Sequence, residues 1–389
     1  MTTKRASGRS DGRGRRAVAK RRERCVRARP SQKKKKSIAG RSTARPHVSE
    51  NNWDTLLDRY GHVERRRVPA SGTVNAEQQL DSLPVTPEEE ANTGIVMSVS
   101  SGRCRAFRHD AELDVIVPSE IAVKQKSRLA VGDRIVIRED SGIHRLTRVL
   151  PRTSVLARPD PLHKHVQRLI AANIDVVVNV VSVKSPPLRP RLIDRYLIAI
   201  QRGGATPVIC VNKVDLLDSK ARNEELAKLD VYRALDVPVI ACSTQSGEGL
   251  DAMRSLLEQR TSALVGHSGV GKSSILNALD TRLQLAIADV SAKRGTGRHT
   301  TTASTLIDFG GGTYIIDTPG IREFGLWNLD RDSLRDYFPE FAEPAEFCRF
   351  TNCSHVHEPD CEVKSRVEAG ALDRARYETY VRLWEEVEE

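Results

Sequence analysis

The sequence contains no apolar run that approaches the roughly 20 residues needed to span a membrane. Its N-terminus is basic but no apolar segment follows, which argues against a secretory signal, and it lacks the amphipathic spacing of an organelle-targeting segment. A lipidation motif is absent as well. These absences predict a cytoplasmic protein that works away from membranes. The length of 389 residues predicts two or three domains.

Acidic residues are scarce in the first fifty positions, which hold 3 Asp and Glu against 18 Lys and Arg. The rest of the chain holds 48 acidic and 44 basic residues, so the net charge of +11 comes entirely from this tail. Its composition, rich in Arg, Gly and Ser, buries too little apolar surface to fold alone. A block of like charge is typical of an arm that binds nucleic acid through its phosphates. The plainer alternative is a solubilising tail without a partner.

Cysteine is also sparse, and its placement matters more than its number. Four of the seven cysteines are scattered, whereas Cys348, Cys353 and Cys361 stand close together near the C-terminus. With His355 they form the spacing Cys-x4-Cys-x-His-x5-Cys, a closed Cys3His set typical of structural zinc. His357 is a rival ligand, and free buried cysteines are the alternative to a metal site. We expect one structural Zn²⁺.

The composition and apolar pattern of the sequence change at three points, which predicts four segments. Residues 1–90 have the composition of a disordered basic tail and linker. Short β-type runs over 91–160 predict a small barrel of the OB type, a fold that often binds oligonucleotides, although few aromatics are present for base stacking. From 161 to 335, apolar runs such as "DVVVNVVSV" and "PVICV" alternate with helical stretches, which predicts a parallel sheet in an α/β domain. Residues 336–389 hold the Cys/His cluster and a helical end.

One segment of the α/β domain fits the phosphate-binding pattern G-x-x-x-x-G-K-[ST] without a mismatch, with an apolar strand before it and a helix-forming run after it. Backbone N–H groups of the loop and the helix N-terminus would surround phosphates. Lys272 would reach the β- and γ-phosphates, and Ser273 would bind Mg²⁺. The alternative is a chance match in a glycine-rich turn. The residues concerned are Gly266, His267, Ser268, Gly269, Val270, Gly271, Lys272, Ser273 and Ser274.

A second segment, "NKVD", follows a buried strand and matches the guanine-recognition signature N-K-x-D. The Asp215 carboxylate can accept from both the ring N1–H and the exocyclic amine of guanine, and adenine has no such pair of donors. A polar turn at the end of a strand is the plainer alternative. The start of "STQSGEGL", after the next strand, stands where a third, weaker loop on the base side is expected. The residues of these two loops are Asn212, Lys213, Val214, Asp215, Ser243 and Thr244.

A further loop, "DTPG", ends another strand and would act on the magnesium side of the nucleotide. Asp317 is placed to hold the Mg²⁺ shell, and Gly320 can offer its N–H to the γ-phosphate. The polar stretch 293–302 is too irregular for a core element and suits a mobile switch, in which one of three threonines would contact Mg²⁺. These are Thr300, Thr301 and Thr302.

The residue after "DTPG" is Ile321, not the Gln that orients the attacking water in Ras-like enzymes. Either turnover is slow or another group supplies that role. His299, beside the threonines, is the candidate, and a solvated loop histidine is the plainer alternative.

The order of these loops differs from that of an ordinary GTPase, in which the phosphate loop comes first. Here "NKVD" precedes "GHSGVGKSS" by about fifty residues. A chance origin would need several motifs in correct local contexts, so a re-ordered chain is the better account. Because domain termini often lie close together, old ends can be joined and new ones cut without disturbing the sheet.

These motifs in this order resemble the circularly permuted GTPases of small ribosomal subunit biogenesis, the RsgA family. The resemblance covers about 90–385 and rests on "NKVD", "GHSGVGKSS", "GRHTTT", "DTPG" and "CRFTNCSHVHEPDC". It implies an OB-type barrel, a permuted GTPase domain and a zinc-containing helical domain that docks on the small subunit. It places zinc on Cys348, Cys353, His355 and Cys361.

The resemblance also implies GTP hydrolysis stimulated by the small subunit, with the GTP/GDP cycle timing late maturation and factor release. His299 matches a switch histidine implicated in hydrolysis. The implied partners are the small subunit and its rRNA, with Mg²⁺ bound alongside GTP, and we expect a monomer. The tail lies outside the resemblance and is predicted to add salt-sensitive, largely non-specific rRNA affinity.

Two other classes of function stay open at this point. One is an RNA-binding assembly factor with a degenerate nucleotide site, and the other is a GTPase of membrane traffic. The second lacks support because apolar segments and lipidation motifs are absent. The first is disfavoured by four intact side chains of the nucleotide loops, namely Asp215, Lys272, Ser273 and Asp317. GTP turnover with and without small subunits separates it from an enzyme.

Overall fold

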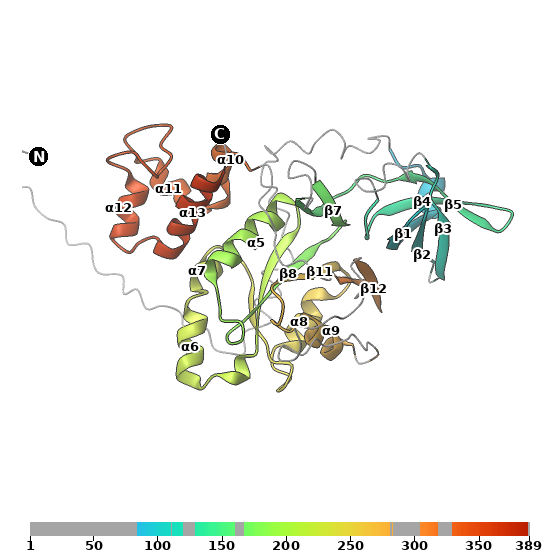
Figure 1. Ribbon diagram of the computed structural model, residues 1–389, viewed down its shortest axis with the longest axis horizontal. Coiled ribbons are helices and arrows are strands. Elements are labelled where there is room, and N and C mark those ends of the chain that lie inside the picture. The colour runs from blue at the N-terminus through green and yellow to red at the C-terminus, as the bar shows by residue number, and fades with distance from the viewer. Residues whose placement is uncertain are drawn as a thin grey trace, which may run out of the picture. The chain divides into compact units, whose positions relative to one another are not determined.

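The structure is a computed structural model that describes residues 84–109, 111–119, 129–159, 167–280, 282, 304–317 and 329–387. All of them belong to one compact unit of the chain, 53–389 (Figure 1). No helix in this described part is long and apolar enough to cross a membrane. Most of the predicted tail, 1–83, lies outside the described residues.

The first group of elements is a closed five-stranded barrel with the strand order β1-β2-β3-β5-β4. Strands β3 and β5 pair in parallel and the other neighbours are antiparallel. Alternate side chains point inward, so Val96, Ile135 and Leu146 fill the interior. The predicted OB-type barrel is confirmed. Its strands are β1 (Thr93–Ser100), β2 (Arg103–Arg108), β3 (Ala111–Ile116), β4 (Arg134–Asp140) and β5 (Ile143–Val149).

A short helix, α2 (Pro87–Ala91), precedes the barrel and overlaps the last residues of the predicted tail. Thr86 and Glu89 form a capping box at its N-terminus, which satisfies backbone N–H groups that the first turn leaves open. Glu89 also accepts from Arg148 of β5, at 3.0 Å. The described helix therefore begins a few residues before the predicted boundary, and the Glu89–Arg148 pair joins it to the barrel.

Two strands that the sequence did not predict follow the barrel. They are β6 (Val155–Pro159) and β7 (Gln167–Ala172), which form an antiparallel two-stranded sheet. Val131 bridges to Ala171 of β7, and a Cβ on Gly132 would lie 2.2 Å from Ala172 O. The barrel therefore approaches this sheet through a glycine that no larger residue could replace without displacing backbone.

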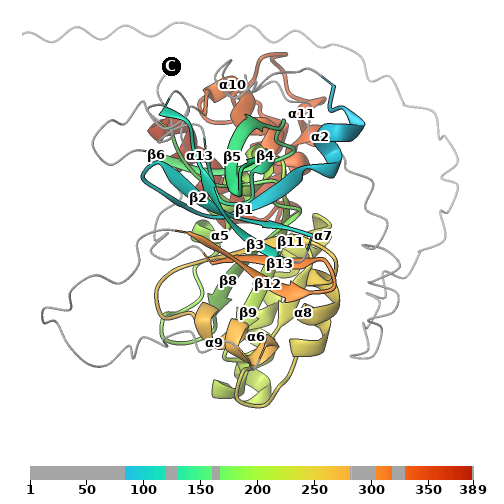
Figure 2. The same ribbon diagram turned by 90° about the vertical axis from the view of Figure 1, so that its right-hand side faces the viewer.

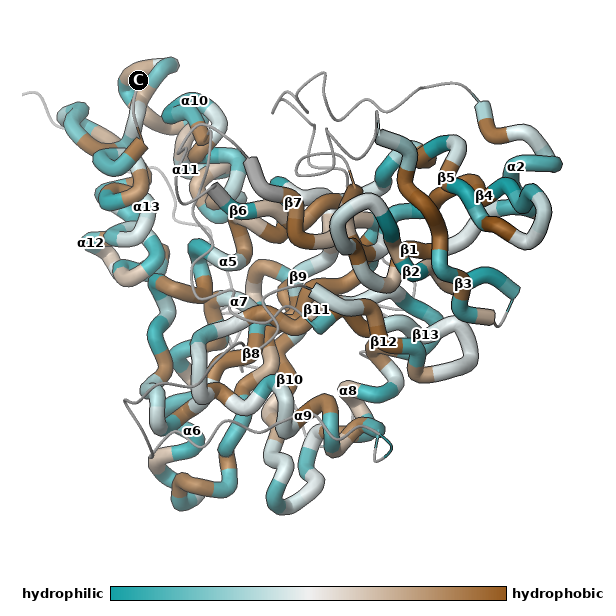
Figure 3. The backbone as a smooth tube through the Cα atoms, turned by 45° about the vertical axis from the view of Figure 1, so that its right-hand side comes forward, coloured by the Kyte–Doolittle hydropathy of each residue, from teal (hydrophilic) through white to brown (hydrophobic). Residues whose placement is uncertain are grey.

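The central element is a six-stranded sheet with the order β10-β9-β8-β11-β13-β12, and Figure 3 shows its middle strands as predominantly apolar. Five strands run in parallel, as predicted, but the edge strand β12 is antiparallel to β13 (Figure 2). Gly311 and Gly312, both at positive φ, form the tight turn that makes this pair a hairpin. The strands are β8 (Val176–Ser182), β9 (Thr206–Asn212), β10 (Val239–Ala241), β11 (Thr261–Val265), β12 (Thr305–Gly310) and β13 (Thr313–Asp317).

Helices cover both faces of this sheet, and alternate side chains of strand β8 face the helices on opposite sides. Val177 faces Tyr196 of α5, whereas Val178 faces the side occupied by α8 and α9, because successive side chains of a strand point to opposite faces. Every residue of β8 is buried, which explains its near-continuous apolar sequence. The helices are α5 (Pro190–Arg202), η2 (Val214–Leu216), α6 (Ser219–Ala227), α7 (Asp230–Ala234), α8 (Leu250–Leu257) and α9 (Lys272–Leu279).

The C-terminal segment is a set of short helices closed by one longer helix. Its apolar core includes Phe338, Phe341 and Tyr380 and extends to Ile198 of α5. The elements are α10 (Arg331–Leu334), η3 (Arg335–Tyr337), η4 (Pro339–Phe341), α11 (Ala342–Ala345), α12 (Glu362–Glu368) and α13 (Arg374–Glu386).

A buried ion group joins α13 to α5. The Arg376 guanidinium donates to Asp194 Oδ1 at 2.7 Å and to Glu340 Oε1 at 2.5 Å. Tyr232 donates its hydroxyl to the same Asp194 oxygen at 2.9 Å. The group pairs Asp194 Oδ1, while Oδ2 has no hydrogen-bond partner among the described residues. The Arg376 charge offsets much of the cost of burying this carboxylate.

Candidate functional site

The phosphate-binding loop connects β11 to α9, as the pattern predicted. Three of its glycines have positive φ: Gly266 at 140°, Gly269 at 84° and Gly271 at 100°. A Cβ on Gly266 would lie 2.2 Å from Val180 O, so the loop passes directly over β8. These conformations let the loop curl so that its N–H groups and the N-terminus of α9 face a common centre.

Lys272, the first residue of α9, lies inside this loop. Its ammonium donates to Gly266 O at 2.7 Å and to His267 O at 3.2 Å. Burial lowers the pKa of Lys272, and the nearby Asp317 carboxylate opposes that shift. The side chain is therefore already directed to where the β- and γ-phosphates of a nucleotide would lie.

The guanine-recognition segment begins at the end of β9 and contacts the phosphate loop directly. Asn212 Nδ2 donates to Val270 O at 2.9 Å, and Lys213 Nζ donates to Gly269 O at 2.7 Å. A Cβ on Gly271 would lie 2.2 Å from Asn212 Nδ2. The two motifs, separated along the chain, thus form one continuous surface at the carboxyl edge of the sheet, where ligands of open α/β sheets bind.

Asp215 is exposed and is oriented by the loop that follows β10. Ser243 Oγ donates to Asp215 Oδ1 at 2.6 Å and accepts from the backbone N–H groups of Gln245 and Ser246. Val214 N donates to Cys242 O at 3.3 Å, which joins the two loops a second time. Ser243 and, next to it, Thr244 therefore lie beside Asp215, and their contact with the base stays a prediction.

The magnesium side is described in part. Ser273 is in the first turn of α9, and Asp317 ends β13 beside Leu264 of β11. A hydroxyl and a carboxylate oxygen at this edge are donors that Mg²⁺ prefers, so the residues present fit that ion. The remaining predicted residues of this side lie outside the described residues: His299, Thr300, Thr301, Thr302 and Gly320.

The predicted metal ligands are brought together by the C-terminal segment. Donor atoms of Cys348, Cys353, His355 and Cys361 all lie within 4.8 Å of one another. The Cys348 and Cys361 sulfurs are 3.8 Å apart, and His355 Nδ1 lies 3.6 Å from Cys348 Sγ and 3.5 Å from Cys361 Sγ. Zn–S bonds of about 2.3 Å and Zn–N bonds of about 2.0 Å in a tetrahedron require edges of about 3.8 Å and 3.5 Å.

The distances therefore fit zinc, and the surroundings suit the ligand set. Burial lowers the pKa of His355, which favours the neutral imidazole that a metal needs. Tyr377 donates its hydroxyl to His355 O at 2.9 Å, which holds the loop in position. The rival ligand His357 is exposed and packs against Trp384 with ring centroids 5.0 Å apart. It does not join the cluster.

Comparison with known proteins agrees with this geometry. A family model described as RsgA GTPase matches residues 149–327. The small ribosomal subunit biogenesis GTPase RsgA of Chlorobaculum parvum is 42% identical over 283 residues, which are 70% of this chain and 90% of that protein. The protein of the same name from Gemmatimonas aurantiaca is 41% identical over 263 residues, which are 67% of this chain and 85% of that protein. The chain belongs to the RsgA family.

Two solved structures have a similar fold. The match with the crystal structure of YjeQ from Thermotoga maritima covers 76% of this chain and 98% of the YjeQ chain, with 30% identity and a TM-score of 0.62. The match with the crystal structure of YloQ, a circularly permuted GTPase, covers 78% of this chain and 98% of the YloQ chain, with 27% identity and a TM-score of 0.59. The re-ordered chain predicted from the motif order is thereby confirmed.

One contact of the RsgA site had no signal in the sequence. Lys213 Nζ also donates to Ser185 O at 2.7 Å, in the loop between β8 and α5. Ser182 Oγ donates to Pro186 O at 2.7 Å and fixes this loop in turn. Backbone carbonyls carry no residue-type pattern, so no motif could have revealed their part in positioning Lys213.

Proposed function

We propose that the protein is a GTPase that binds the small ribosomal subunit and couples GTP binding and hydrolysis to late subunit maturation and assembly-factor release. The observation that carries this proposal is the contact between the guanine segment and the phosphate loop, made by Asn212 with Val270 and by Lys213 with Gly269. Loops that meet in this way offer one site for a guanine base and its phosphates. Membership of the RsgA family supports the same function.

The side chains divide the work on GTP between base and phosphates. Asp215 accepts from the N1–H and the exocyclic amine of guanine while the Ser243 hydroxyl holds its carboxylate in position. Lys272 exchanges the loop carbonyls for phosphate oxygens and opposes the charge that develops there during hydrolysis. Mg²⁺ supplies further positive charge when it is bound with GTP, and Ser273 and Asp317 are the residues that would hold it.

The partner we propose is the small ribosomal subunit with its rRNA, and we expect the chain to act as a monomer in the cytoplasm. The family's name supports the subunit as partner. Zinc on Cys348, Cys353, His355 and Cys361 would stabilise the C-terminal segment in the form that docks on the subunit.

The deciding experiment is GTPase activity titrated with purified small and large ribosomal subunits separately. Small subunits are expected to raise the turnover of wild-type protein by at least about tenfold, which is less than the roughly 10³- to 10⁵-fold that activating proteins give other GTPases. Lys272→Ala provides the background, because it removes the phosphate-binding ammonium. Equal stimulation by both subunits contradicts the proposed partner. Turnover no higher than in Lys272→Ala favours an RNA-binding factor that does not hydrolyse GTP.

His299 is proposed to orient the attacking water, because Ile321 occupies the position after "DTPG" and cannot. We expect His299→Ala to lower subunit-stimulated hydrolysis about a hundredfold while GTP binding stays unchanged. Unchanged stimulated hydrolysis would rule out this role.

The basic tail is proposed to add salt-sensitive rRNA affinity. Deletion of residues 1–50 should make the slope of log affinity for the small subunit against log salt concentration less steep, because fewer phosphate contacts release counterions. An unchanged slope shows that the tail does not contact the subunit's phosphates.

A further inference from the structure

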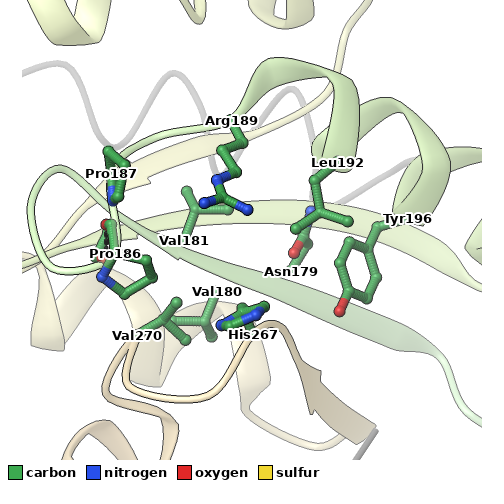
Figure 4. Close-up of a pocket in the computed structure, with 11 residues that line it drawn as sticks. Asn179, Val180, Val181, Pro186, Pro187, Arg189, Leu192, Tyr196, His267 and Val270 are labelled. Atoms are coloured by element: carbon green, nitrogen blue, oxygen red, sulfur yellow. Dashed lines mark hydrogen bonds between the residues drawn. The ribbon is translucent and has the colours of Figure 1, made fainter. Parts of the chain in front are cut away.

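A pocket lies between the phosphate loop and the start of α5 (Figure 4). Its volume is about 360 Å³ including the open mouth. The phosphate loop contributes His267 and Val270 to its wall, and no carboxylate is among the described residues that line it. The other polar residues of the wall are Asn179, Ser182, Arg189 and Tyr196.

Asn179 is the first sign that this pocket takes a ligand. It lies in the middle of β8, is completely buried and occurs in an otherwise apolar run. Within the described parts of the chain, neither Nδ2 nor Oδ1 of its amide has a hydrogen-bond partner. Buried amides are nearly always paired, and an unpaired one costs free energy that an apolar residue at the same position would not. Figure 4 shows the amide between the α5 side and the phosphate-loop side of the pocket.

Arg189 is the second sign. It is the residue before α5 and is exposed. Its carbonyl accepts from Leu192 N and Ile193 N, but its side chain makes no hydrogen bond or ion pair with any residue that the structure describes. In Figure 4 its guanidinium turns from the start of α5 toward Val181 and the interior of the pocket. A guanidinium that finds no carboxylate in such a place is suited to a tetrahedral oxyanion, which it can bind with two parallel hydrogen bonds.

The N-terminus of α5 adds positive charge at the same place. No side chain caps this helix of 13 residues, and its first turn holds no acidic residue. The partial positive charge of the helix end is therefore not compensated by the chain, and helix N-termini of this kind attract anions. Amide, guanidinium and helix end all favour one class of ligand.

We propose that this pocket binds inorganic phosphate, the product of GTP hydrolysis, as it leaves the phosphate loop. The inference rests on the proposed GTPase activity, and it adds a second phosphate site beside the nucleotide. Free phosphate is favoured over other anions because the pocket shares His267 and Val270 with the loop that is expected to hold the γ-phosphate. Arg189 would donate to the phosphate oxygens, and the buried amide nitrogen of Asn179 would donate to them once the side chains that cover it move aside.

The test is calorimetric titration of inorganic phosphate into the full-length protein loaded with GDP and Mg²⁺. Arg189→Ala should weaken phosphate binding about tenfold or more, because a charge-assisted hydrogen bond is lost. Asn179→Leu should weaken it about fivefold and leave the melting temperature at or above that of wild type. Arg191→Ala is the matched control, since this nearby guanidinium pairs with Glu378 at 2.7 Å and should leave phosphate affinity unchanged.

Three results would overturn the proposal. Wild-type phosphate affinity in both pocket variants would mean that phosphate binds only in the loop. A lower melting temperature of Asn179→Leu with unchanged phosphate affinity would mean that the amide serves the fold. If Arg189→Ala weakened binding of a short oligouridylate but not of phosphate, the ligand would be an RNA phosphodiester. Because the titration needs no turnover, absence of GTPase activity would contradict the proposed function without deciding the phosphate site.

Discussion

Gly271 is the residue at which the base side and the phosphate side of the site meet. Its φ is 100°, and an added Cβ would lie 2.2 Å from the Asn212 amide, which is buried and held by Val270 O. We expect Gly271→Ala to lower GDP affinity at least about tenfold, because Asn212 or the loop must move. Gly102→Ala is the control: φ is 73°, but no atom lies within 4 Å. Its GDP affinity should equal that of wild type in equilibrium binding. If both variants lost GDP affinity equally, the loss in Gly271→Ala would not come from its contact with Asn212.

Asp215 is the residue that we expect to select guanine. Asp215→Asn keeps an oxygen that can accept from Ser243 but replaces the other carboxylate oxygen with a donor. GTP affinity should fall about a hundredfold or more, and xanthosine triphosphate should become the better ligand, since its C2 oxygen can accept from the new amide. Competition against labelled GDP measures both. Asp251→Asn, at a side chain that is 96% exposed on α8, should change neither affinity. Unaltered base preference in Asp215→Asn would remove this residue from guanine recognition.

Residues of the site were predictable where side-chain chemistry defines a motif. Lys272, Asp215 and the four Cys/His residues belong to motifs of defined type and spacing, so the sequence alone predicts their roles, and the structure brings the four Cys/His residues together. Asn179 and Arg189 belong to no pattern, and their surroundings are set only when β8, the phosphate loop and α5 come together. An asparagine within an apolar strand was the single available hint, and it had no meaning without the pocket.

Elements were predicted well where hydrophobic periodicity is strong. The buried strands β8 and β9 lie on the apolar runs "DVVVNVVSV" and "PVICV", and α13 forms the predicted helical end. The antiparallel direction of β12 depends on the three-glycine turn at 310–312, and the β6–β7 pair depends on contacts with the barrel end. Both are matters of pairing between segments, which the period of a single segment does not encode.

The contact between α5 and α13 depends on one buried cation. Arg376 and Asp194 are 4% and 1% exposed, so Arg376→Met would leave the Asp194 carboxylate buried without its cation. We expect a loss of about 3–5 kcal/mol in the free energy of unfolding, measured with denaturant. Arg191→Ala breaks the exposed ion pair between the same helices and should cost less than about 1 kcal/mol. Comparable losses in the two variants would show that burial of the pair is not what stabilises this contact.

At the scale of the whole molecule, we expect the Cys3His cluster to make the C-terminal segment depend on metal. Cys361→Ser should abolish the one zinc per chain and unfold residues around the cluster, because structural zinc contributes about 10–16 kcal/mol in zinc-finger peptides and exceeds the stability of a small domain. GTP affinity should be retained, since the nucleotide residues lie on the sheet and its loops. Metal analysis and limited proteolysis check both statements.

His357→Ala is the matched variant for the metal site, because His357 faces Trp384 instead of the cluster. It should keep its zinc, whereas His355→Ala should lose it. If His357→Ala lost its zinc and His355→Ala kept it, His357 would be the ligand in place of His355.

The direct contact between the two nucleotide loops has a consequence for synthesis of the protein. Asn212 and Lys213 bond to carbonyls that follow them by 58 and 56 residues, so they leave the ribosome long before their partners do. Three strands of the sheet, β8, β9 and β10, can pair while translation continues. The guanine segment cannot make its contacts until the phosphate loop has been synthesised, and Asp317 is synthesised later still. A growing chain therefore gains its nucleotide site only when nearly all of the sheet has been translated. GTP binding thereby marks a finished domain, and a truncated product has no means of entering the nucleotide cycle.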